Sequence, residues 1–116
     1  MDDGGVAWVE RAQRYGDRTA LVAEEGAYRY RDLLAASASA ARALLAGAPD
    51  LCETRVAFLT PPGFDYAVAQ WGVWRAGGIA VPLCTLHPAP ELEYVVSDAQ
   101  AGIVVAHPAY AGALQP

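Results

Sequence analysis

The sequence predicts an α/β fold: a mostly parallel sheet with flanking helices and an N-terminal β-hairpin. Three observations predict it. The 116 residues suffice for one domain with a core, and 54% hydrophobic against 18% charged residues is typical of a globular chain. After a hairpin pattern, helix-like and strand-like segments alternate. The strand-like segments are almost continuously apolar, as in parallel strands that helices cover on both faces.

The first third of the chain predicts a helix and then an antiparallel hairpin. Trp8, Ala12 and Tyr15 lie at i, i+4 and i+7, on one face of a helix, and residues 16–17 break it. A strand at residues 19–24, a turn at residues 25–26 and a second strand at residues 27–30 follow.

A second helix is predicted over residues 31–45. Alanine dominates it and favours helix intrinsically. Gly47 and Pro49 then end the helix. Four residues at helical spacing mark the expected buried face: Leu34, Ala38, Ala41 and Leu45.

Strands and helices alternate in the rest of the chain. Residues 55–60 predict a central strand, and residues 64–76 predict a helix so apolar that it is buried on most sides. A strand at 79–83, a helix from residue 91 and a strand at 102–106 follow. Residues 107–116 lack a clear pattern, so we expect a fold that is cut rather than completed.

Charge and composition exclude several classes of function. The net charge of −5 argues against nucleic acid and anionic membranes as partners. All eight basic residues are arginine, so no mechanism in this chain can use a lysine. Cys52 and Cys84 are expected to be reduced thiols, and neither His87 nor His107 forms a metal-ligand cluster with them.

The sequence shows no membrane span, because no segment approaches ~18 consecutive apolar residues. The start is acidic, whereas secretory signals and transit peptides carry early basic residues. We therefore expect a soluble, cytoplasmic protein. An organelle form whose transit peptide has been removed stays open.

Two glycine-containing segments are candidates for nucleotide loops. Residues 60–63 follow a strand and precede a helix, where ligands bind in open α/β sheets, but Pro61 and Pro62 remove the amides that would hold a phosphate. A rigid turn is therefore favoured there. Gly77 and Gly78 lie between a helix and a strand, which favours a helix C-cap.

The remaining candidates also favour structural roles. His87 lies in a loop near Thr85 and Glu91, with Cys84 three residues away, but spacing alone makes no catalytic relay. Trp71 and Trp74 are expected in the core or at an interface with a missing part. We predict no catalytic, cofactor-binding or metal-binding residue in this chain.

Several segments, in order, resemble the AMP-forming acyl-CoA synthetases, a family of adenylate-forming ligases. Residues 71–83 contain an Ala-Gly-Gly helix end followed by Val-Pro-Leu. Residues 91–101 resemble the family's Glu-Leu-x-Tyr helix, and residues 17–22 with Tyr28, Tyr30 and Leu33 resemble its opening. Residues 61–66, 70–72 and 84–88 look most similar to malonyl-CoA-synthetase-like members.

The resemblance implies the chemistry of a ligase of fatty acid metabolism. A carboxylate attacks ATP to give an acyl-adenylate, with Mg²⁺ balancing charge, and the CoA thiol then displaces AMP. The family's Pro-Lys phosphate loop, its Thr-Glu segment, its ribose-binding aspartate and its C-terminal lysine are absent here. Residues 1–116 would therefore be one N-terminal portion of an AMP-binding domain, truncated before the phosphate loop and inactive alone.

Two hypotheses about the partners of this chain follow. As an incomplete part of the adenylate-forming N-terminal domain, the chain would pack against the remainder of the synthetase. As a free-standing interaction domain without catalysis, it would bind a partner or itself through an apolar surface near Trp71 and Trp74. The sequence identifies neither the acyl substrate nor the oligomeric state.

Overall fold

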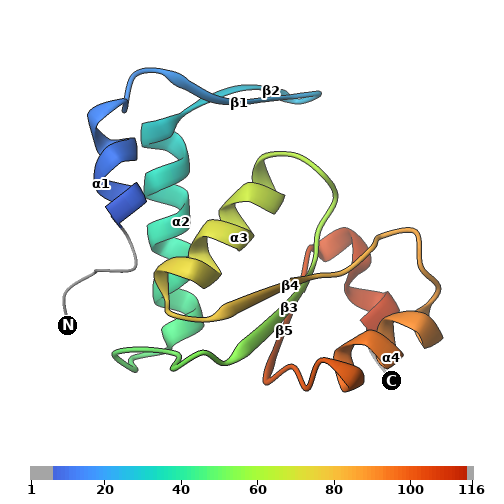
Figure 1. Ribbon diagram of the computed structural model, residues 1–116. Coiled ribbons are helices and arrows are strands. Elements are labelled where there is room, and N and C mark those ends of the chain that lie inside the picture. Colours follow the sequence, from blue (N-terminus) through green and yellow to red (C-terminus); the bar gives the residue numbers. More distant parts are fainter. Residues whose placement is uncertain (1–6, 115–116) are drawn as a thin grey trace.

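The computed structural model describes residues 7–114, and it confirms the alternation of helices and strands (Figure 1). The elements in chain order are α1 (Ala7–Arg14), β1 (Thr19–Ala23), β2 (Gly26–Arg29), α2 (Tyr30–Leu45), β3 (Arg55–Leu59), α3 (Phe64–Arg75), β4 (Ile79–Pro82), α4 (Ala89–Asp98), β5 (Ile103–Ala106) and a 3₁₀ helix, η2 (Pro108–Leu114).

The strands form two sheets. β1 and β2 pair antiparallel as the predicted hairpin. β3, β4 and β5 form a parallel sheet in the order β4-β3-β5, so that β3 is central. In register, Val56 lies opposite Ala80 on one side and Ile103 on the other. The α/β fold with a parallel sheet and an N-terminal hairpin is thus confirmed.

The core of the sheet lies around β3. Ala57 and Leu59 pack with Leu92 of α4 on one face, where Tyr110 of η2 also contacts the cluster. Phe58 faces the opposite side, where it lines a cavity together with residues of α2 and α3. Residues from Val56 through Leu59 are at most 1% exposed, as expected of a strand covered on both faces.

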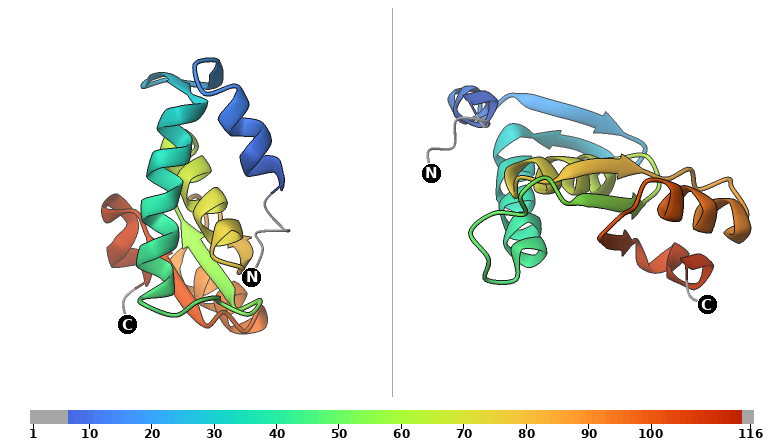
Figure 2. Two further views of the ribbon diagram at one scale, coloured as in Figure 1. Left: turned by 90° about the vertical axis from the view of Figure 1, so that its left-hand side faces the viewer. Right: turned by 60° about the horizontal axis from the view of Figure 1, so that its bottom comes forward.

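Helices α2 and α3 cross closely because small residues meet at the contact (Figure 2). A Cβ on Gly72 would lie 2.8 Å from the Cβ of Ala40, a distance that real side chains do not adopt. Next to this contact the Arg75 guanidinium donates to Ser37 Oγ at 3.0 Å and to the Leu34 carbonyl at 2.8 Å.

This crossing shifts the buried face of α2 from the predicted one. Leu33 and Ser37 are 3% and 0% exposed and lie with Ala41 on the buried row, whereas Leu34 is only half-buried. The prediction followed hydrophobicity alone. The structure instead buries a serine, because its small side chain lets α3 approach and its hydroxyl accepts from Arg75.

Helix α3 is less buried than the sequence predicts. Gly72 and Val73 are buried, but Trp74 is 44% exposed and Asp65 lies on the surface. The reason is that α1, α2 and the sheet cover only part of its circumference. Trp8 of α1 packs edge-on against Trp71 and Trp74, with ring centroids 4.6 and 5.9 Å apart.

Some element boundaries differ from the predicted ones. Tyr30 begins α2 instead of ending a strand, and α4 begins at Ala89 with Pro90 in its first turn. Tyr15 lies beyond the end of α1 and is 42% exposed. The predicted C-cap after α3 is present, since Gly77 adopts φ of 85°.

Candidate functional site

The carboxyl ends of β3 and β5 meet at the point where the chain turns to opposite faces of the sheet. β3 leads into α3 on one face, while β5 leads into η2, which packs with α4 on the other. In open α/β sheets, such a switch point is the usual location of a ligand site. Thr60 and His107 are the residues that follow the two strands, and Asp65 lies in the first turn of α3.

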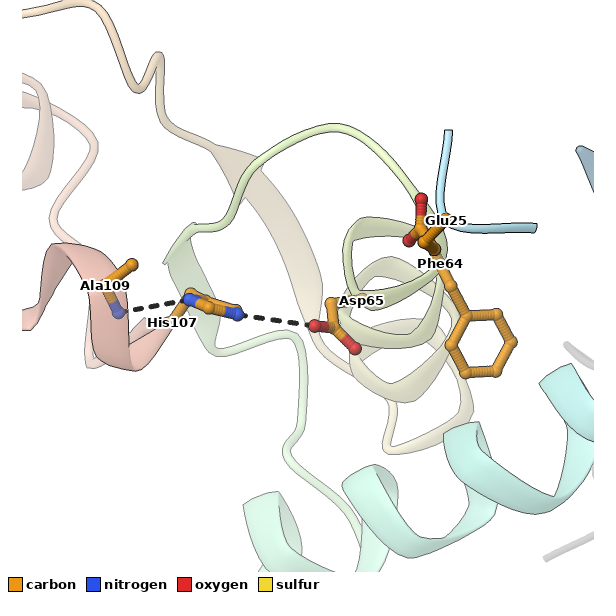
Figure 3. A network of polar contacts seen from close by, with 5 residues as sticks. All are labelled: Glu25, Phe64, Asp65, His107 and Ala109. Carbon is orange, nitrogen blue, oxygen red and sulfur yellow. Dashed lines mark hydrogen bonds and ion pairs between the residues drawn. The ribbon is translucent and has the colours of Figure 1, made fainter. Parts of the chain in front are cut away.

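His107 joins these elements through both of its ring nitrogens (Figure 3). Its Nδ1 accepts a hydrogen bond from the Ala109 amide at 3.1 Å. In the neutral ring the proton therefore sits on Nε2, which lies 3.4 Å from the Asp65 carboxylate. The Asp65 side chain is 62% exposed, so the pair lies at the mouth of the site.

Thr60 contributes a polar atom without a partner. The residue is 7% exposed, and its Oγ1 makes no hydrogen bond within residues 7–114. Buried hydroxyls almost always have a partner, and an unpaired one costs roughly 1–3 kcal/mol. Thr60 lines a cavity together with Asp65 and His107.

This cavity has a volume of about 480 Å³ and lies between α2, α3 and the sheet. Apart from the three polar residues at the switch point, its walls are apolar. They include Ala43 and Leu44 of α2, Val68 of α3, Phe58 of β3, and Ile103 and Val105 of β5. The site is suited to apolar groups with a polar atom at one end.

A separate contact occupies the start of α3. The Phe64 amide donates to Glu25 Oε2, in the hairpin turn, at 3.1 Å. Gly63 precedes it with φ of 137°, and a Cβ there would lie 2.7 Å from the same carboxylate oxygen. The helix N-terminus therefore already holds an internal carboxylate. Residues 60–63 connect β3 to α3 with a bend at Pro62 and Gly63.

Tyr28 packs over this contact. Its ring stacks on Phe64 with centroids 4.1 Å apart. Desolvation by burial, followed by the nearby carboxylates of Glu25 and Asp65, raises the pKa of the Tyr28 phenol above its ordinary value. The neutral phenol is thus the form that this position favours.

The other sequence candidates do not form a site. His87 Nε2 lies 3.7 Å from Glu91 Oε2, and both side chains are largely exposed. Cys84 and Cys52 are free, exposed thiols. Within residues 7–114 no three His, Cys, Asp or Glu side chains are arranged to hold a metal ion.

The sequence did not single out Thr60, Asp65 and His107 as a group. Thr60 follows a strand and Asp65 lies in the first turn of a helix. Such positions are typical of ligand sites in open α/β sheets, and they are the signal in the sequence that points to these two residues. The order of the strands, which brings β5 beside β3, is not visible in the sequence.

None of the helices within residues 7–114 combines the length and apolar character needed to cross a membrane.

Comparison with known proteins shows a consistent set of relatives. The family model described as AMP-binding enzyme matches residues 8–115. The chain is 44% identical over 110 residues to the mitochondrial malonate–CoA ligase ACSF3 of Homo sapiens, which covers 91% of this chain and 19% of the relative. It is 43% identical over 115 residues to the same-named protein of Xenopus laevis, covering 96% of this chain and 20% of the relative.

Solved structures share the fold. The N-terminal domain of FACL13 from Mycobacterium tuberculosis has a TM-score of 0.81 and 25% identity, covering 98% of this chain and 29% of that one. ATP-bound MatB from Rhodopseudomonas palustris has a TM-score of 0.78 and 27% identity, covering 98% and 23%. The chain spans about a fifth of the length of the curated relatives described above.

Proposed function

This chain belongs to the AMP-binding enzyme family, and we propose that it is the N-terminal structural portion of an AMP-forming acyl-CoA synthetase. The observation that carries the proposal is the continuous match of nearly the whole chain to about a fifth of two malonate–CoA ligases, at 43–44% identity. In the proposed whole enzyme, a carboxylate, ATP and CoA give acyl-CoA, AMP and pyrophosphate.

In this proposal, ATP, Mg²⁺ and CoA bind to residues outside this chain. The residues described here do not fit an ATP phosphate. The Phe64 amide at the start of α3 is already bound to the Glu25 carboxylate, and Asp65 adds a second negative charge beside it. No lysine is present to compensate these charges. The role of this portion is to fold and support the catalytic part.

The acyl substrate proposed for the whole enzyme is malonate. The support is the name of the two vertebrate relatives, malonate–CoA ligase. No residue of this chain is assigned to malonate. Substrate choice would then depend on residues outside the portion described here.

The proposal is tested by measuring malonate-dependent pyrophosphate release. The isolated chain should show none with malonate, acetate or benzoate. A hybrid, in which this chain replaces the matching segment of the human ligase, should release pyrophosphate with malonate. A folded hybrid without activity, or activity of the isolated chain above background, would overturn the proposal.

The location of the protein is also a proposal. The human and frog relatives are named as mitochondrial, which favours an organelle form over the cytoplasmic one expected from the acidic start. Fractionation of the cells that express the whole protein decides between the two. Recovery with the cytosolic marker would contradict the organelle form.

The second reading, a free-standing interaction domain, has less support. Trp8 covers part of the surface near Trp71 and Trp74 that was expected to bind a partner. The relatives described above do not favour that hypothesis. We retain self-association as an outcome to be measured, not as the proposed function.

A further inference from the structure

Three of the eight arginines line one hollow at the end of α1. This hollow has a volume of about 480 Å³, and its lining includes Arg14, Arg18 and Arg31 together with Tyr15 and Asp17. Among the described residues that line it, Asp17 alone carries a carboxylate. Three positive charges beside one negative charge are a local excess in a chain whose net charge is −5.

Hydrogen bonds fix the backbone around this arginine hollow. The Arg31 amide donates to the Gly16 carbonyl at 3.0 Å, and the Tyr30 amide donates to the Arg18 carbonyl at 3.0 Å. These bonds attach the loop after α1 to the first turn of α2. Segments that hold one another in place carry the arginines, so a ligand would bind with little reordering of the backbone.

Two of the guanidinium groups are positioned by neighbouring residues of the same hollow. Arg31 Nη2 lies 2.7 Å from Asp17 Oδ1, and the Arg18 guanidinium lies 4.9 Å from the centre of the Tyr15 ring. Arg14 makes no hydrogen bond or ion pair with residues 7–114. Each guanidinium has five N–H donors, so these three arginines retain donors that no other group of the described chain uses.

The ion pair with Asp17 does not account for the cluster. Its two side chains are 57% and 82% exposed, and such surface pairs contribute little to stability. Arg31 also lies in the first turn of α2, where the helix dipole disfavours a positive charge. The Asp32 carboxylate of that turn accepts from the Arg29 amide at 2.9 Å and does not line the hollow. The positive charge there is compensated only in part.

A phosphate dianion matches this excess of charge. Guanidinium groups bind phosphate oxygens through two parallel N–H donors, which makes arginine well suited to phosphate recognition. Two negative charges balance three arginines beside one aspartate, whereas a carboxylate carries only one. The hollow is open and leaves space for a group esterified to the phosphate.

We propose that the arginine hollow binds a soluble phosphomonoester. The ligand contacts the end of α1 and the start of α2, so its binding stabilises this part of the fold. The site is separate from the switch point at Thr60 and His107, and α1 lies at the opposite end of the molecule from α4 and η2 (Figure 1). The proposal does not depend on the proposed function, because it uses residues of this chain alone.

A phosphate headgroup in a membrane fits the site less well. The net charge of −5 opposes the approach of the whole chain to an anionic surface. Glu24 and Glu25 also form the turn of the neighbouring hairpin. A small anion in solution meets only the local excess of positive charge, which favours a soluble ligand.

The first experiment titrates the isolated chain with glycerol 2-phosphate in its dianionic form. Amide signals of residues 15–18 and Arg31 should shift and saturate in NMR spectra, and the melting temperature should rise. Acetate at the same ionic strength should produce neither change, because it carries one charge. Absence of saturable shifts with the phosphomonoester, or equal shifts with acetate, would overturn the proposal.

Removal of single charges assigns the binding to the hollow. Arg14→Gln and Arg18→Gln should each weaken the affinity about tenfold, as expected for a lost hydrogen bond to a charged group. Arg42→Gln is the matched control, since Arg42 is exposed on α2 and does not line the hollow. It should leave the affinity unchanged. An equal loss in Arg42→Gln would show diffuse attraction instead of a site.

Two further variants test the sign and the geometry of the interaction. Asp17→Asn removes the opposing charge and should tighten binding, and weaker binding there would count against the proposal. Arg14→Lys keeps the charge but loses the paired donors. It should therefore bind more weakly than the unmodified chain and more tightly than Arg14→Gln. Both positions are exposed, so the fold should tolerate these changes.

Co-sedimentation with vesicles separates the two sources of phosphate. The chain should stay in solution with phosphatidylcholine vesicles, whether or not these contain phosphatidic acid. Sedimentation with the phosphatidic acid vesicles that glycerol 2-phosphate does not prevent would show a lipid surface as the partner and overturn the proposal.

The hybrid with the human ligase provides a second measurement. Glycerol 2-phosphate should raise its melting temperature less after Arg14→Gln than before, while malonate-dependent pyrophosphate release stays unchanged. An inactive hybrid that still shows this difference would refute the proposed function alone. An active hybrid whose response to glycerol 2-phosphate is the same with and without Arg14→Gln would refute the arginine hollow alone.

Discussion

Glu25 accepts a hydrogen bond from the amide of Phe64 at 3.1 Å, although the two residues lie in different layers of the fold. Figure 3 shows the carboxylate at the start of α3, reaching over from the hairpin turn. The helix has no capping side chain of its own, because its N-cap residue is Gly63. The hairpin therefore provides the cap and is attached to α3 by it.

Removal of this cap should destabilise the chain. Glu25→Ala leaves the Phe64 amide without its acceptor, and we expect a loss of about 1 kcal/mol in the free energy of unfolding. Glu25→Gln keeps an acceptor but loses the charge, and should cost less. Urea denaturation measures both. Glu24→Ala, at the exposed neighbouring position, is the control and should have little effect; an equal loss there would contradict the capping role.

The close crossing of α2 and α3 should be sensitive to a single methyl group. Gly72→Ala places a Cβ 2.8 Å from that of Ala40, so the helices must move apart. We expect a loss of roughly 1–3 kcal/mol in unfolding free energy, as for other overpacked cores, despite the better helix propensity of alanine. The measurement is thermal or urea unfolding.

Gly112→Ala serves as the matched control for that change, since nothing lies within 4 Å of a Cβ at Gly112. It should be close to neutral. A Gly72→Ala variant as stable as the unmodified chain would show that α3 and α2 can separate at no cost, against the packing described here.

Ionisation of Tyr28 should make stability depend on alkaline pH. Burial and the Glu25 carboxylate raise the pKa of its phenol in the folded chain. Folding therefore favours the neutral phenol of Tyr28. The stabilisation of the folded chain that results is fully present below the ordinary pKa of 10.0 and is lost as the pH rises past it. The free energy of unfolding should decline there. In Tyr28→Phe this part of the decline should disappear, and an unchanged pH profile would contradict it.

Local patterns in the sequence determined the kind and order of the elements. The spacing of apolar residues marks α4, the largely apolar segment at residues 64–76 marks α3, and the turn at residues 25–26 marks the hairpin. The resemblance to adenylate-forming ligases also came from ordered local segments, and the absence of lysine follows from composition alone. These features depend only on residues that are near one another in the chain.

Only the tertiary structure decided which elements are neighbours. Strand order β4-β3-β5 places His107 beside Thr60, and it makes β3 the central strand of the sheet. The crossing with α3 selects Ser37 over Leu34 as a buried residue of α2. Hydrophobic periodicity cannot give these results, because it indicates which face of an element is apolar but not which elements pack against it. That choice depends on how side chains far apart in sequence pack together.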